Sequence, residues 1–157
     1  MALFAKYDGI DGESKDANHG NWIDVLSLDW GAYRPDDKKG VSRRRGAAIV
    51  EDLVLTLDYE KAATKLQEKC LKGEVIPKLE IELTATYGGA RATYLKYELK
   101  NVMISSYQTN ASGNDEESPA VILANNFEEI KVTYTEYDDA GAIKGNVETR
   151  YKVSKKK

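Results

Sequence analysis

The sequence predicts an all-β fold, mainly antiparallel, that forms a small β-barrel or a tight two-sheet sandwich with one flanking α-helix. Three observations support this prediction. Apolar and polar residues alternate with a period of two over several segments, one segment alone has a helical period, and the 157-residue chain has the size of a single domain. Residues 1–157 are therefore expected to fold as one domain.

The N-terminal segment predicts two strands joined by a turn-rich loop. Residues 4–7 are β-forming, residues 8–20 are rich in Gly and Asp, and residues 21–30 resume as a strand. Four large apolar side chains of the second strand share one face, which is expected to be the core face: Trp22, Leu26, Leu28 and Trp30.

The next segment is a charged loop that ends in a second strong strand. Residues 34–46 hold the most concentrated positive charge of the chain, but the net charge of −3 argues against nucleic-acid binding. A solvated loop and a contact with an acidic surface of another subunit remain as alternatives. Residues 47–57 predict a strand that places these residues together: Ile49, Leu53, Leu55 and Leu57.

One helix is expected, over about residues 59–72. Its apolar stripe follows the i, i+3, i+4, i+7 spacing and comprises Tyr59, Ala62, Ala63, Leu66 and Cys70. Asp58 is a plausible N-cap, and Gly73 can adopt the left-handed turn that ends a helix. Cys70 has no cysteine partner in the chain and is expected to be a small core residue.

The second half of the chain predicts further antiparallel strands. Residues 78–87 and 129–137 alternate cleanly, and the alternation returns from residue 147 to residue 153. Gly88 and Gly89 suggest a hairpin turn. Residues 93–107 alternate only as far as Asn101, after which apolar residues occupy both faces, so a bulge or a doubly buried end is expected there.

Catalytic, metal-binding and cofactor-binding motifs are not found. The only histidine, His19, lies in a loop of Asp, Asn and Gly and is expected at the surface without a chemical role. Acidic pairs such as Glu116 and Glu117 are adjacent in sequence, which favours solvated side chains over a two-carboxylate active site. No apolar stretch is long enough to span a membrane, and no signal sequence is recognised.

The run FAKYDGIDGESKDANHGNWIDVLSLDWG, residues 4–31, resembles the N-terminal signature of the haemolysin-coregulated protein family, Hcp, of bacterial type VI secretion systems. The order of strand, long loop, strand and helix also resembles the family, as do VMISSYQ at residues 102–108, the loop 112–118 and the strand 127–137. The resemblance covers nearly the whole chain.

The resemblance implies a structural function. Family members form a small barrel with one helix, assemble as homohexameric rings that stack into a tube, and work with sheath and spike proteins and with effectors carried in the lumen. It implies assembly in the bacterial cytoplasm and secretion without a signal peptide, with no nucleic acid, no cofactor and no membrane insertion. The extended loop at residues 35–46 would contact a neighbouring subunit or ring through Pro35, Asp36, Asp37, Lys38, Lys39, Arg43, Arg44 and Arg45.

Two further expectations concern the polar surface. A polar strand face could line a water-filled lumen, although the exterior of a barrel has the same pattern: Lys78, Glu80, Glu82, Thr84 and Thr86. Residues 155–157 form a short basic tail with no room for a fused toxin. The alternatives are a secreted β-sandwich binding module, which predicts a monomer with an exposed aromatic patch, and a small hydrolase, which predicts a concave site with perturbed carboxylates.

Overall fold

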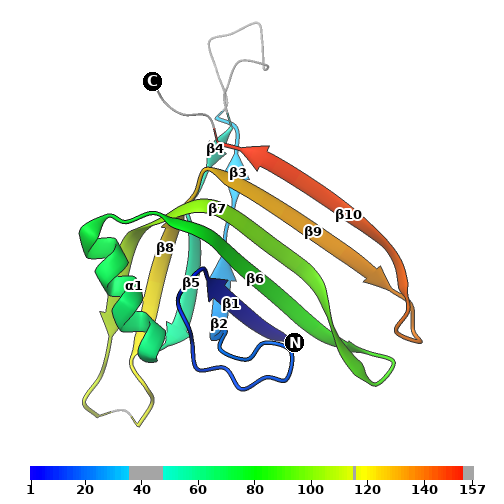
Figure 1. The fold of residues 1–157 in the computed structure, drawn as a ribbon, viewed down its shortest axis with the longest axis horizontal. Helices are drawn as coiled ribbons and strands as arrows, with labels where there is room; N and C mark the ends of the chain where they lie inside the picture. Colours follow the sequence, from blue (N-terminus) through cyan, green and yellow to red (C-terminus); the bar gives the residue numbers. More distant parts are fainter. Residues whose placement is uncertain (36–47, 115, 154–157) are drawn as a thin grey trace, which may run out of the picture.

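The computed structural model describes residues 1–35, 48–114 and 116–153. The described residues form ten strands and one helix (Figure 1). Their bounds are β1 Ala2–Tyr7, β2 Ile23–Asp29, β3 Ala32–Tyr33, β4 Ile49–Val50, β5 Leu53–Asp58, α1 Lys61–Lys72, β6 Ile76–Tyr87, β7 Ala90–Asn110, β8 Ala120–Asn126, β9 Glu129–Tyr137 and β10 Ile143–Lys152. The predicted all-β class with one flanking helix is confirmed.

Six strands close into an antiparallel barrel. Their order is β7-β6-β1-β2-β5-β8, and β8 pairs back onto β7. Closure is possible because β7 is 21 residues long and changes partner along its length. Its first half pairs with β6 on one side and β9 on the other, whereas its second half pairs with β8. The alternatives of a barrel and a sandwich are thus resolved in favour of the barrel.

The change of partner on β7 occurs at the bulge that the sequence predicts. Asn101 has a positive φ of 52°, and the register with β8 shifts between Ile104 and Ser106. Asn tolerates the left-handed region better than most residues, so this break in alternation has a local cause. Val102 and Ile104 are buried, but Met103 is 40% exposed, so the end of this run is not buried on both faces.

For the first half of β2, the prediction of which side chains face the core is wrong. Ile23 and Val25 are buried, whereas Leu26 is 57% exposed. The register between β2 and β5 shifts between Val25 and Ser27. This bulge exchanges the two faces of the strand, so that Leu28 then packs against the core. A bulge has no reliable signal in the alternation of a single strand.

The helix starts later than predicted. It spans Lys61–Lys72, its N-cap residue is Glu60 without a side-chain cap, and Asp58 ends β5. A Glu13 carboxylate oxygen instead accepts a hydrogen bond from the Lys61 backbone N–H at 2.8 Å. The cap therefore comes from the N-terminal loop. Gly73 ends the helix in the left-handed conformation, as predicted.

The barrel core is mainly apolar, and all six strands of the barrel contribute side chains to it. Leu53, Leu55 and Leu57 of β5 are fully buried, and the predicted helix residues Ala62, Ala63 and Leu66 join the same cluster. Tyr59 precedes the helix and is 40% exposed, so it does not belong to the buried stripe. Cys70 is partly buried against the core.

The predicted strand at residues 47–57 divides into β4 and β5, and Ile49 of β4 is 41% exposed. In Figure 1 the helix lies against the barrel on the side opposite a sheet extension formed by β6, β7, β9 and β10.

Candidate assembly surface

The sheet continues beyond the closed barrel. β1 pairs with β6 only as far as Thr84, while β6 and β7 run on to a tight turn at Gly88 and Gly89, both with positive φ. β9 and β10 extend alongside in the same direction (Figure 1). We call this extension, residues 83–96 and 133–148, the arm. Within the described part of the chain β10 pairs only with β9, which leaves the outer edge of the arm without a strand partner.

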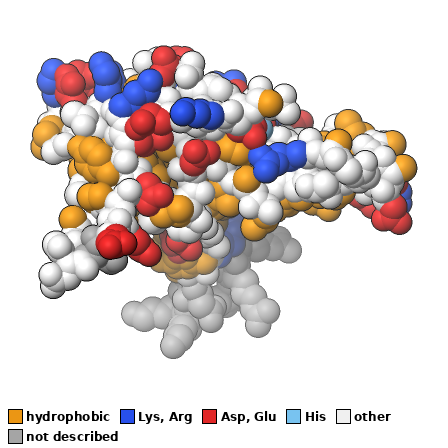
Figure 2. Space-filling model, turned by 90° about the horizontal axis from the view of Figure 1, so that it is seen from below, with side chains coloured by type: hydrophobic (Ala, Val, Ile, Leu, Met, Phe, Trp, Pro, Cys, Tyr) orange, Lys and Arg blue, Asp and Glu red, His pale blue; other side chains and the backbone are white. Residues whose placement is uncertain are grey.

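One face of the arm continues the barrel core but is left uncovered. The register places five apolar side chains in one row across the strands: Val25, Leu3, Leu83, Leu95 and Tyr134, followed by Val147 on β10. Exposure rises along this row, from 8% at Val25 to 47% at Tyr134 and 69% at Val147. Figure 2 shows hydrophobic side chains exposed along the arm, which extends to the right. Apolar side chains concentrated at a sheet edge are typical of a contact surface.

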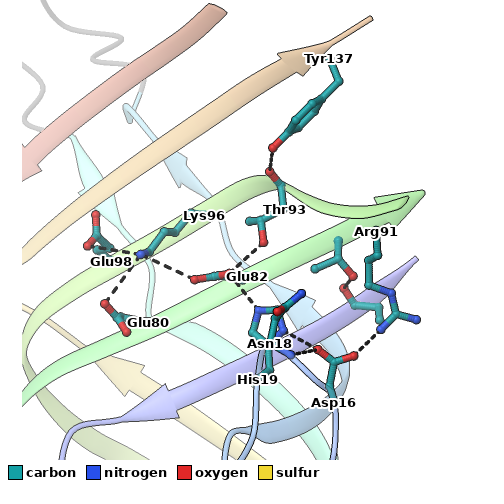
Figure 3. A network of polar contacts seen from close by, with 12 residues as sticks. Asp16, Asn18, His19, Glu80, Glu82, Arg91, Thr93, Lys96, Glu98 and Tyr137 are labelled. Atoms are coloured by element: carbon teal, nitrogen blue, oxygen red, sulfur yellow. Dashed lines mark hydrogen bonds and ion pairs between the residues drawn. The ribbon is translucent and has the colours of Figure 1, made fainter. Parts of the chain in front are cut away.

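The opposite face of the same strands is charged. Lys96 on β7 lies 3.6 to 3.9 Å from carboxylate oxygens of Glu80, Glu82 and Glu98, as Figure 3 shows. Lys131 on β9 lies 3.5 Å from Glu98. Burial opposes ionisation of Glu98, but the surrounding lysine ammonium groups outweigh it and hold its pKa below the usual value. Glu80 and Glu98 face each other across β6 and β7, and the neighbouring lysines on β7 and β9 compensate their like charges.

The polar side chains predicted to share one face of β6 lie on this charged face, but one of them, Thr84, is not exposed. Lys78, Glu80 and Glu82 point to the same side as Lys96 and take part in its ion pairs or in neighbouring ones. Thr84 belongs to the same row but is only 1% exposed, and its hydroxyl donates to the Ala2 carbonyl at 3.4 Å. Other parts of the chain therefore cover Thr84, and its side chain is not exposed to solvent.

His19 is buried, so the predicted surface position is wrong. The residue is 4% exposed, and its ring stacks on Phe4 with centroids 4.2 Å apart and meets Trp22 edge-on at 4.9 Å. Nδ1 lies 2.8 Å from an Asp16 carboxylate oxygen, and Nε2 lies 2.9 Å from a Glu82 carboxylate oxygen. Glu82 is 63 residues away in sequence, and only the pairing of β1 with β6 brings it close.

Further polar groups surround the His19 cluster, which we define as Asp16, His19 and Glu82 (Figure 3). Arg91, near the tip of the arm, binds the second Asp16 oxygen at 2.6 Å. Thr93 donates its hydroxyl to Glu82 at 2.8 Å. The hydrogen bond to His19 lowers the pKa of Asp16 despite some burial. Burial opposes ionisation of Glu82, but hydrogen bonds from His19 and Thr93 and the nearby charges of Lys96 and His19 together lower its pKa.

The charged loop that the sequence singles out lies mostly outside the described residues. Of the predicted contact residues only Pro35 is described, and it is exposed. Asp36, Asp37, Lys38, Lys39, Arg43, Arg44 and Arg45 fall in the segment 36–47. The flanking strands β3 and β4 pair with each other, with Tyr33 opposite Ile49. Its role in subunit contact stays a prediction.

The described residues provide neither a metal site nor a membrane-spanning helix. Across residues 1–35, 48–114 and 116–153, no group of three or more His, Cys, Asp and Glu side chains could hold a metal ion. In the same ranges, no helix has the length and apolar character to cross a bilayer.

Comparison with known proteins identifies the family. Residues 4–138 match the family model described as type VI secretion system effector, Hcp. The chain belongs to the Hcp family. Protein hcp1 of Pseudomonas aeruginosa is 30% identical over 144 residues, which cover 91% of this chain and 88% of that protein.

Solved structures of type VI secretion system proteins share the fold over nearly the whole chain. One, described as a type six secretion system protein, has a TM-score of 0.89 and 26% identity, and the match covers 98% of this chain and 96% of the other. A type VI secretion system effector from Yersinia pestis has a TM-score of 0.77 and 26% identity, and covers 96% and 99% of the two chains. The barrel, the helix and the arm thus belong to an Hcp fold.

Proposed function

We propose that this Hcp protein is the repeating subunit of the inner tube of a type VI secretion system, in which six copies form a ring and rings stack into a hollow tube. The observation that carries the proposal is the arm. Among the described residues, its apolar face continues the core without cover, and the outer edge of β10 has no strand partner. A second copy that accepts the arm through a different surface forms a head-to-tail contact, and such contacts close into a ring when the rotation fits.

The charged face is proposed to line the lumen. Its lysines and glutamates neutralise one another across β6, β7 and β9, and such a surface is compatible with water on one side of a half-buried sheet. Effector proteins would travel past this face, while sheath and spike proteins would contact the outside and the end of the tube. The role is structural, and the proposal includes no catalytic step.

Membership of the family implies secretion through the type VI apparatus. We propose that the subunit assembles in the bacterial cytoplasm and leaves the cell within the tube, a route that requires no signal peptide. The β-sandwich binding module is less well supported, because the sheet closes into a barrel.

The arm contact can be tested with two neighbouring residues of β10. Val147 pairs with Tyr134 on the apolar face, whereas Asn146 pairs with Thr135 and alternates to the charged face. Val147→Asp places a charge in the proposed contact, and Asn146→Asp adds the same charge on the other side. Size-exclusion chromatography with light scattering should give a hexamer-sized particle for the natural sequence and for Asn146→Asp, and a single chain for Val147→Asp.

Circular dichroism provides the control, because Val147 is 69% exposed and its substitution should leave the barrel folded. A natural sequence that remains a single chain at high concentration would contradict the ring. A ring that survives Val147→Asp would show that the arm does not form the contact.

The charged loop is proposed to act in ring stacking. Reversal of Arg43, Arg44 and Arg45 to Glu should shorten or abolish tubes while single rings persist, because charge repulsion would replace attraction between stacked rings. Electron microscopy measures tube length directly. Tubes of unchanged length would contradict this role.

A further inference from the structure

Both ring nitrogens of His19 face carboxylate oxygens, at 2.8 Å for Asp16 and 2.9 Å for Glu82. A neutral imidazole has one N–H donor and one lone pair, while an ionised carboxylate only accepts. A neutral ring would therefore point a lone pair at one of the two carboxylates. We infer that His19 is held as an imidazolium, with both nitrogens protonated, and that it clamps the N-terminal loop onto β6 at the base of the arm.

Charged groups from three elements surround the ring. Asp16 comes from the loop after β1, Glu82 from β6, and Arg91 and Lys96 from β7. Arg91 binds Asp16 at 2.6 Å, but Lys96 lies 3.6 Å from Glu82 and is shared with two other glutamates. The short cationic contact of Glu82 is therefore His19.

A neutral His19 ring would lose the hydrogen bond to one of the two carboxylates. Asp16 would keep Arg91, whereas Glu82 would keep only the neutral Thr93 hydroxyl and the more distant Lys96. A buried or half-buried carboxylate without a close positive partner is unfavourable. A neutral ring should thus hold the loop less tightly than an imidazolium. The charged form of His19 explains why both carboxylates can remain ionised on a face that the loop covers.

The loop that the clamp holds contacts both the helix and the arm. Its Glu13 caps the start of α1, its backbone pairs with itself through Ser14 N–H to Trp22 C=O at 2.8 Å, and its Asp16 reaches Arg91 on the arm. His19 is thus a positioning residue that acts on the arm indirectly. It orients Asp16, which binds Arg91 of the arm, and Glu82, which accepts a hydrogen bond from Thr93 of the arm. This consequence rests on the proposed function, in which the arm meets the next subunit.

The protonation state can be measured directly, because His19 is the only histidine in the chain. Protein labelled with ¹⁵N in histidine alone gives two ring-nitrogen resonances. Magic-angle-spinning NMR of sedimented protein records them whatever the size of the assembled particle. At pH 7 both nitrogens should be protonated. A non-protonated ring nitrogen would overturn the inference, whatever the assembly state.

The positioning role is tested by dilution of assembled protein. His19→Gln removes the charge, Arg91→Gln removes the link to the arm, and Lys15→Gln removes an exposed cation of the same loop. Loss of a charge-assisted hydrogen bond should raise the protomer concentration at which rings dissociate roughly tenfold for the first two variants. Lys15→Gln should match the natural sequence.

Equal dissociation of the His19→Gln and Lys15→Gln variants would overturn the positioning role. Absence of rings from the natural sequence would contradict the proposed function instead, and the nitrogen spectrum would still decide the state of His19. Circular dichroism at the same concentrations shows whether a variant has unfolded.

Discussion

The hydrogen bond between Tyr7 and Asn125 is expected to stabilise the barrel strongly, because it crosses the core. The Tyr7 hydroxyl on β1 donates to Asn125 Oδ1 on β8 at 2.6 Å, and both residues are fully buried. The two strands are not neighbours in the sheet. Burial raises the pKa of Tyr7 well above its usual value, so the hydroxyl remains a donor. Asn125 is fixed in place because its Nδ2 donates to the Leu53 carbonyl at 2.9 Å.

Tyr7→Phe would leave the Asn125 carbonyl oxygen buried without this donor. Removal of one partner of a buried hydrogen bond costs the desolvation penalty of the group left unsatisfied, about 1 to 3 kcal/mol. We expect the free energy of unfolding to fall by about 2 kcal/mol, which reduces the folding equilibrium constant roughly 30-fold and lowers Tm by about 4 to 8 °C.

Tyr59→Phe is the matched control, since Tyr59 is 40% exposed and its hydroxyl meets Thr64 at the surface. Urea unfolding at one fixed protomer concentration gives both free energies, and the fixed concentration matters because assembly adds to apparent stability. We expect less than about 0.5 kcal/mol for Tyr59→Phe. A Tyr7→Phe loss as small as that of the control would refute the reasoning.

Three other predictions follow from burial, charge and backbone contacts. Leu55→Ala should lower the free energy of unfolding by about 3 kcal/mol because Leu55 is fully buried, whereas Leu26→Ala should change it by less than about 0.5 kcal/mol, and urea unfolding compares them. Folding lowers the pKa of Asp16 and Glu82, so these carboxylates bind protons more readily in the unfolded chain than in the folded one. The urea midpoint of unfolding should therefore fall as pH drops below about 4. A midpoint that does not change there would contradict the ion pairs. Gly12→Ala should loosen the N-terminal loop, because a Cβ at Gly12 would clash with a facing backbone carbonyl, and faster amide exchange in the loop is the expected result.

Patterns with a local cause predicted the fold well. The alternation from residue 78 to residue 87 identified β6, the alternation from 129 to 137 identified β9, and Gly73 marked the end of the helix. Each rests on side-chain periodicity or on a backbone conformation that one residue type favours. Such signals require no knowledge of distant contacts.

Features set by distant contacts could not be predicted in this way. The bulge after Val25 depends on how β2 bridges β1 and β5, so the large side chain of Leu26 was assigned to the wrong face. The cap of α1 comes from Glu13, 48 residues earlier in the chain. His19 has no local signal for burial, and only the meeting of the loop with Glu82 creates its site.

The two proposed contacts can be separated by the order in which they act. Tubes require rings, so a change that opens the ring must also abolish the tube, whereas a change in stacking leaves rings intact. Val147→Asp on the arm should therefore remove both rings and tubes, and the reversal of Arg43, Arg44 and Arg45 should remove tubes alone. His19→Gln should resemble a weak form of the arm variant, because its effect passes through the position of the arm. A His19→Gln protein with stable rings and short tubes would instead place the N-terminal loop in the stacking contact.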